Sequence, residues 1–213
     1  MTMSVEAVTK LFTRSDGQFV FARWARPIAP IVFGVEDETI STVKGAVEAV
    51  VTLAGHKMVE TDPELGANMM WFFLRDWSEL LETPDLDRLI PDLSPLVERL
   101  HAAEANQYRI FRFEPDGGIK ACFIFIRMDE VMSDISADVL TLGQAVQSIL
   151  LWSDEAFLGT SLMIAAEDGP VLRSDIADIV RAAYDPLLPA ASRDVSHALR
   201  LSARLAPGQE TLQ

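Results

Sequence analysis

The feature that most constrains this chain is a pair of apolar segments joined by a turn, at residues 108–126. Residues 108–113 combine aromatic and aliphatic side chains with two arginines, and residues 121–126 are apolar throughout. Between them lies Pro115-Asp116-Gly117-Gly118, which is typical of a turn. Strands joined by so short a connection pair antiparallel, so the sequence predicts a β-hairpin. Because a strand and not a helix follows the two glycines, they indicate a hairpin turn rather than a phosphate-binding loop.

Two helical patterns stand on either side of this hairpin. After the acidic residues 36–38, apolar side chains recur every three or four positions as far as Gly55, which predicts a long helix. A second pattern opens at Asp138 and is apolar on both flanks as far as Leu150, which predicts a central helix. Shorter helices are predicted at residues 4–12, 78–81, 94–105, 174–183 and 192–205.

Two further segments are predicted strands. Residues 68–77 are predicted to form a buried strand, because residues 69–74 are an unbroken apolar run. Residues 19–35 are rich in aromatic and β-branched side chains but contain Pro27 and Pro30, which favours a bent or edge strand. We therefore expect one α+β domain over residues 1–213, with a small mixed sheet of about four strands and helices mainly on one face. We expect disordered ends at residues 1–3 and 206–213.

The charge of the chain limits its partners. Its 213 residues include 18 lysines and arginines against 32 aspartates and glutamates, a net charge of −14. Such a chain repels phosphate backbones and anionic lipid, so we expect neither a nucleic-acid nor a membrane partner. The N-terminal residues lack the apolar core of a secretory signal, and no apolar stretch approaches the roughly 20 residues that cross a bilayer, so we expect a cytoplasmic protein.

The sequence contains no recognisable catalytic or metal-binding motif. His56, His101 and His197 stand apart from one another, so we expect no metal and no cofactor. Ser161 lacks the second glycine of a nucleophile elbow, which favours a loop residue. Cys122, the single cysteine, lies in an apolar strand where a thiolate is disfavoured, so we expect a structural role.

Two short segments, in the predicted order of elements, suggest a relationship. Arg23-Trp24-Ala25-Arg26-Pro27-Ile28, before the bent strand, and residues 178–187, which contain Tyr184-Asp185-Pro186, resemble an uncharacterised bacterial family. That family is often predicted to be secreted or lipid-anchored and is distantly similar to zincin metallopeptidases. The resemblance covers roughly residues 21–190 and implies a zincin-like fold, with the central helix in the place of the active-site helix.

The resemblance also implies a degenerate active site. Gly143, Gln144 and Gln147 stand where a zincin has its histidine-glutamate-x-x-histidine motif. Glutamine has no titratable group near neutral pH, and its amide oxygen is a weak zinc ligand. The peptidase mechanism is therefore absent from this position, and we expect a protein without that activity.

Three hypotheses about function follow. The first is a non-catalytic domain that binds a peptide or partner protein by adding a strand to an exposed edge near residues 27–35, with a cleft lined by Trp71, Phe73 and Trp152. The alternative is a hydrolase that uses carboxylates dispersed in the sequence, such as Glu60, Glu64 and Asp129. The third is an assembly protein that forms a homodimer through exposed aromatic side chains.

Overall fold

A computed structural model describes residues 3–164 and 171–205. The predicted disorder at residues 1–2 and 206–213 lies outside the described residues. The described helices are α1 (Val5–Phe12), α2 (Asp37–Leu53), α3 (Glu79–Glu82), α4 (Leu86–Leu89), α5 (Leu93–Ala102), α6 (Glu130–Ser133), α7 (Ala137–Ile149), α8 (Ser174–Ala183) and α9 (Ser196–Leu205). The described strands are β1 (Phe21–Ala22), β2 (Pro30–Phe33), β3 (Met69–Leu74), β4 (Gln107–Phe113), β5 (Ile119–Arg127), β6 (Met163–Ile164), β7 (Val171–Leu172) and β8 (Ala191–Ser192).

The centre of the molecule is a mixed sheet of four strands in the order β2-β3-β5-β4. Strands β2, β3 and β5 run parallel, and β4 pairs antiparallel with β5, so the predicted hairpin is confirmed. Its register places Arg109 opposite Ile124 and Phe111 opposite Cys122. The α+β class and the mixed four-stranded sheet are confirmed as well.

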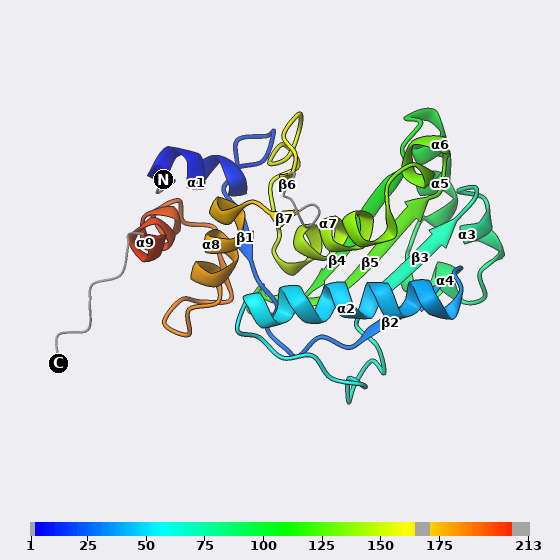
Figure 1. Ribbon diagram of the computed structural model, residues 1–213, viewed down its shortest axis with the longest axis horizontal. Coiled ribbons are helices and arrows are strands. Elements are labelled where there is room, and N and C mark those ends of the chain that lie inside the picture. The colour runs from blue at the N-terminus through cyan, green and yellow to red at the C-terminus, as the bar shows by residue number, and fades with distance from the viewer. Residues whose placement is uncertain (1–2, 165–170, 206–213) are drawn as a thin grey trace.

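The two faces of the sheet are covered unequally. The two longest helices, α2 and α7, lie side by side across one face (Figure 1). Under them are alternate side chains of the central strands, including Trp71, Phe73 and Ile124. The opposite face carries a smaller apolar cluster in which Phe72 and Phe125 pack beneath α3, α4 and α5. The longest helices thus share a face, while three short helices close the other.

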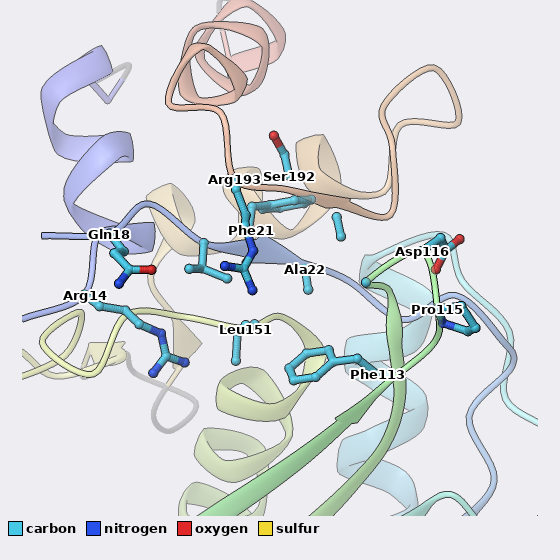
Figure 2. Close-up of a pocket in the computed structure, with 13 residues that line it drawn as sticks. Arg14, Gln18, Phe21, Ala22, Phe113, Pro115, Asp116, Leu151, Ser192 and Arg193 are labelled. Atoms are coloured by element: carbon cyan, nitrogen blue, oxygen red, sulfur yellow. The ribbon is translucent and has the colours of Figure 1, made fainter. Parts of the chain in front are cut away.

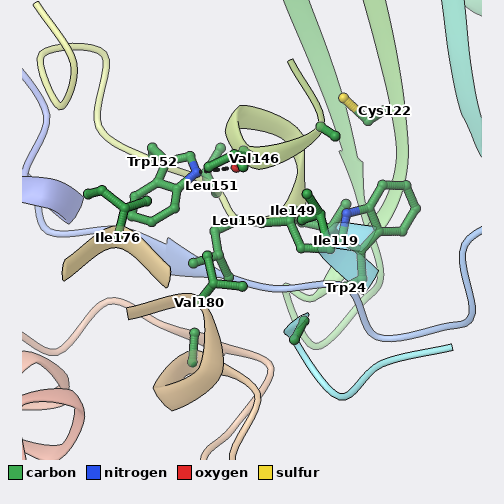
Figure 3. Close-up of a cluster of buried hydrophobic side chains, with 14 of the residues drawn as sticks. Trp24, Ile119, Cys122, Val146, Ile149, Leu150, Leu151, Trp152, Ile176 and Val180 are labelled. Atoms are coloured by element: carbon green, nitrogen blue, oxygen red, sulfur yellow. Dashed lines mark hydrogen bonds between the residues drawn. The ribbon is translucent and has the colours of Figure 1, made fainter. Parts of the chain in front are cut away.

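The ends of the described chain gather at one end of the sheet. Helices α1, α8 and α9 lie together there, next to the small sheet that β1 forms with β8 (Figure 1). One hydrophobic cluster joins this region to α7 and the main sheet. Figure 3 shows Ile176 and Val180 of α8 facing Leu150 and Trp152, which follow α7.

Residues 19–35 form two strands rather than the single strand that their composition predicts. Phe21 and Ala22 pair with β8, and only residues 30–33 join the main sheet, as its edge strand β2. Between them, Pro27 lacks a backbone N–H and interrupts any continuous ladder. Helix α9 begins at Ser196 and not at residue 192, because Ser192 belongs to β8.

Neither α4, inside the proline-containing stretch, nor the short helix α6 was anticipated. None of the helices in the described part of the chain is long and apolar enough to cross a membrane.

Candidate functional site

The two glutamines of the predicted degenerate motif lie on the face of α7 that is turned toward β4. Helix α7 begins after Ser136, and Asp138 in its first turn is favourable to the helix dipole. Gln144 and Gln147 are three residues apart, so their side chains lie on the same side of the helix. Gln144 is 3% exposed, whereas Gln147 is half-buried. The structure therefore directs these two amides at the neighbouring strand.

The side chain that meets them is Arg109 of β4. Its Nη1 donates to Gln144 Oε1, and its Nη2 donates to Gln147 Oε1 at 2.7 Å. A third amide completes the cluster, since Gln107 Oε1 accepts from Gln144 Nε2 at 2.7 Å and from Arg109 Nη1 at 3.4 Å. We call Gln107, Arg109, Gln144 and Gln147 the arginine–glutamine cluster.

Arg109 forms no direct ion pair in the described part of the chain, although Asp154 lines the same pocket. Each side chain that contacts the guanidinium is a neutral amide, and none of the ion pairs among the described residues includes Arg109. Cys122 lies nearby, but burial raises the pKa of its thiol to about 12, so it is neutral at pH 7. Burial also lowers the pKa of Arg109. The arginine nevertheless stays charged, because guanidinium begins from so high a value.

A pocket of about 560 Å³ opens in front of the cluster. Gln107, Arg109 and Gln147 line it together with the aromatic side chains of Trp152 and Phe157. Trp152 is held in place by its indole Nε1, which donates to the carbonyl of Val146 at 2.8 Å (Figure 3). The pocket thus combines a cation and amide groups with apolar walls, as small-ligand sites commonly do.

A second pocket of about 630 Å³ adjoins the first, since both are lined by Arg14 and Leu151. Figure 2 shows Arg14 and Arg193 on one side of it and Phe113 and Asp116 on the other. The arginines that line the two pockets are Arg14, Arg109 and Arg193, and the acids are Asp116 and Asp154.

Both acids of these pockets already accept hydrogen bonds within the protein. Asp154 accepts from the amide and the hydroxyl of Ser15, which lowers its pKa, and Asp116 accepts from the Gly118 amide. These hydrogen bonds come from uncharged groups and leave both carboxylates negative. With three arginines against two aspartates, the described lining has a formal charge of +1 on a chain whose total charge is −14.

Strand β4 runs along both pockets. Its residues 107, 108, 109 and 111 line the first, and Phe113 lines the second. Among the described strands, β4 pairs with β5 alone, so its other edge has no strand partner. A register shift between Arg112 and Phe113 interrupts the ladder at the end of the strand.

The other predicted cleft residues lie elsewhere. Trp71 is fully buried beneath α2 and α7. Phe73 belongs to the same core and also lines a separate pocket beside β2. Of the three predicted aromatic residues, only Trp152 shares a pocket with Gln147. Gly143 is half-buried, and a side chain added there would meet no neighbouring atom within 4 Å, so packing does not require a glycine.

The three dispersed carboxylates named as a possible catalytic set do not come together. Glu64 pairs with Lys120 near the start of β5, and Asp129 follows the end of that strand. A strand rises about 3.3 Å per residue, so roughly 20 Å or more separates these two places. Glu60 is exposed in a loop. Over the described ranges, 3–164 and 171–205, no three potential ligands group around a possible metal position.

Cys122, the Gly117-Gly118 turn, Ser161 and His197 lie where ordinary structural roles account for them. Cys122 is fully buried in β5, and Gly117-Gly118 forms the hairpin turn, as predicted. Ser161 is exposed in a loop. His197 lies in the first turn of α9 but is 1% exposed, and its ring packs on Phe21 at a centroid distance of 4.2 Å.

Sequence reasoning missed Gln107 and Arg109, although a signal for them exists. In a strand, alternate residues share a face, so Arg109 has the same parity as Phe111 and Phe113. A charged residue in an otherwise apolar row indicates a buried polar contact. The sequence does not show, however, that this face of β4 packs against α7.

Comparisons with known proteins give no relative from which a role could be carried over. No family model, no curated protein and no solved structure matches this chain. The arrangement of its own residues is therefore the basis for a functional conclusion.

Proposed function

We propose that this protein is a binding domain that takes up an extended, acidic peptide segment along the outer edge of β4. The observation that carries the proposal is the position of this edge, which has no partner strand among the described residues and runs along two adjoining pockets. Peptides commonly bind in this way. Their main chain extends the sheet, and alternate side chains enter pockets beside the strand.

The two free edges of the sheet are not equivalent. Strand β2, near the edge that the sequence suggested, has four residues and begins with Pro30, which cannot donate a hydrogen bond. Strand β4 has seven residues and no proline. The longer edge provides more main-chain groups for a bound peptide, which favours β4.

Charge favours an acidic peptide over a basic one. Arg14, Arg109 and Arg193 line the pockets and outnumber the two aspartates there, Asp116 and Asp154. By contrast, the pocket beside β2 is lined by Glu79 and Glu82 and by no described lysine or arginine. A peptide carrying aspartate or glutamate would be attracted to the β4 side by complementary charge.

The proposed relationship to zincins agrees with binding rather than peptide hydrolysis. In this proposal α7 corresponds to the peptidase active-site helix, and its Gln144 and Gln147 hold an arginine in place of a zinc ion. The alternative hydrolase is less well supported, because two of its three named carboxylates, Glu64 and Asp129, lie at opposite ends of β5. The homodimer has no described observation that favours it.

An array of immobilised decapeptides with varied acidic, neutral and basic positions tests the proposal. We expect acidic, extended peptides to bind, and we expect hydrogen–deuterium exchange with the tightest binder to slow at the amides of β4. The amides of β2 serve as an internal control and should exchange at an unchanged rate. Slowing at β2 instead of β4, or a preference for basic peptides, would contradict the proposal.

A pair of charge reversals separates the pocket from the general charge of the surface. Arg14→Glu should weaken binding of the same peptide by about tenfold or more, because Arg14 lines both pockets. Arg88→Glu makes the same change in charge on α4, where the side chain is 78% exposed and lines neither pocket. It should change the affinity by less than about threefold at physiological salt. Equal losses for both variants would show that only overall charge matters.

A further inference from the structure

We infer that the arginine–glutamine cluster is a recognition subsite for a carboxylate group. This inference rests on the proposed function and deepens it, because it assigns the chemical group that enters the first pocket. Arg109 is the specificity-determining residue of the subsite, and Gln144 and Gln147 position it.

The first argument is the missing counter-charge. Arg109 is half-buried, and removing a cation even partly from water is costly unless an anion compensates it. The chain has 32 acidic residues, yet no described carboxylate pairs with Arg109. Three amide oxygens satisfy hydrogen bonds of the guanidinium without neutralising it. The cation therefore remains available to an anion that enters the pocket.

The second argument is the remaining donor capacity of the guanidinium. An arginine side chain has five N–H donors. The described contacts use Nη1 and one position of Nη2, and none of them involves Nε. A carboxylate prefers two hydrogen bonds from one guanidinium, and the Nε hydrogen and the second Nη2 hydrogen are the donors left for such a pair. The amides of Gln144 and Gln147 fix the plane in which these donors are presented.

The third argument concerns the walls of the pocket. Trp152, Phe157 and Phe111 contribute apolar surface to the same pocket, and an ion pair is stronger beside such a low-dielectric surface than in open water. The volume of about 560 Å³ accepts a side chain of the size of glutamate. The carboxylate could belong to an acidic side chain or to the C-terminus of a peptide, and the experiment has one arm for each source.

The test uses the full chain labelled with nitrogen-15, with small probes observed through the arginine Nε–H signals. The first probe is N-acetylglutamate α-amide, whose only charge is the side-chain carboxylate, and the second is N-acetylglycine, which has only a terminal carboxylate. We expect at least one of them to shift the Arg109 signal in a saturable manner, and the one that does so identifies the source. N-acetylglutamine α-amide is the neutral control and should leave the signal unchanged. The inference fails if neither carboxylate probe shifts the signal, or if the neutral control shifts it equally.

Two variants make the test specific. Arg109→Gln removes the cation, and Gln147→Glu keeps it but adds a counter-charge within reach, since Gln147 Oε1 already lies 2.7 Å from Nη2. Both should weaken binding of the carboxylate probe by about tenfold or more. If Arg109→Gln fails to fold, Gln147→Glu still decides, because undiminished binding to a folded Gln147→Glu protein would overturn the inference.

The outcome can be separated from that of the proposed function. With a bound acidic peptide, its acidic side chains are replaced one at a time by their amides, and its C-terminal carboxylate is replaced by an amide in a further peptide. One of these changes should weaken binding to the natural chain and have no effect in Arg109→Gln. If peptides bind along β4 but none of these changes has that pattern, the carboxylate subsite is wrong and the peptide-binding proposal stands. If small carboxylates bind at Arg109 but no peptide binds, the carboxylate subsite stands and the peptide-binding proposal is wrong.

Discussion

Two arginines of this protein, Arg26 and Arg109, are each held by three side chains, but of opposite electrical character. Arg26 forms ion pairs with Asp62, Glu64 and Glu114. Among the described residues, the side-chain hydrogen bonds of Arg109 all go to glutamine oxygens. Since the chain is rich in acidic residues, the contrast arises from where these residues are placed and not from how many there are.

The comparison shows how one residue type serves structure in one place and recognition in another. Arg26 ties together loops that are distant in sequence, and Asp62, 3% exposed, also accepts from the backbone amides of Glu64 and Leu65. Burial tends to lower the pKa of Arg26, but the hydrogen bonds with Glu114, Glu64 and Asp62 outweigh it and raise that pKa. The charge of Arg26 is thus compensated by carboxylates of the protein itself. Arg109 instead lines a pocket, where we infer that its charge binds a carboxylate.

The largest effect is expected from Arg26→Met. This change leaves Asp62 as a buried carboxylate without its cation, and breaking a buried pair from one side typically costs several kcal/mol. We expect the free energy of unfolding, measured with urea, to fall by about 3 kcal/mol. Arg88→Met, which removes an exposed pair with Asp85, is the control and should cost no more than about 0.5 kcal/mol. If Arg26→Met costs as little as Arg88→Met, Arg26 does not have the structural role that distinguishes it from Arg109.

A smaller effect is expected from acid, and only at the Arg26 site. Burial tends to raise the pKa of Asp62, but hydrogen bonds from the Leu65 and Glu64 amides, Arg26 and Asn68 outweigh it and lower that pKa below 3.8. Because the unfolded chain then binds a proton more readily, this contribution is present above pH 3.8 and is lost as the pH falls through the folded-state value. Asp62→Asn should therefore lose less stability than the natural chain between pH 5 and pH 2 in urea titrations. Parallel curves for the two proteins would contradict this assignment.

The smallest effect on stability is expected from Arg109→Met. The change gives up hydrogen bonds to neutral amides, but it also removes the cost of burying a cation without a counter-charge, and the two contributions oppose each other. We expect the free energy of unfolding to change by no more than about 1 kcal/mol, with carboxylate binding lost. If instead stability falls by as much as in Arg26→Met, the arginine–glutamine cluster is a structural element and the comparison breaks down.

The secondary structure could be predicted where the pattern is local. The hairpin follows from Pro115-Asp116-Gly117-Gly118 between two apolar segments, and α2 and α7 follow from apolar residues at helical spacing. Residues 19–35 were harder, because their division between two sheets depends on β8, which lies about 170 residues later in the sequence. Propensity contains no information about a partner so distant.

The candidate site was predictable in part. Gln144, Gln147 and Trp152 were singled out from the sequence, and the structure places Gln147 and Trp152 in one pocket. Arg109 was assigned only to a strand, and Trp71 was grouped with Trp152 although it lies in the core beneath α2. Sequence spacing shows which residues share one face of a helix, but it does not show which strand packs against that face.

The sequence by itself determined the elements, the overall acidity and the absence of a histidine-based motif on α7, because each depends on residue type and spacing within one segment. Only the tertiary structure decided that β4 lies at an edge of the sheet among the described strands and that two pockets adjoin along it. It also decided that Arg109 meets amides while Arg26 meets carboxylates. The physical reason is that the energy of a charge depends on what surrounds it in space, and folding brings those neighbours from distant parts of the chain.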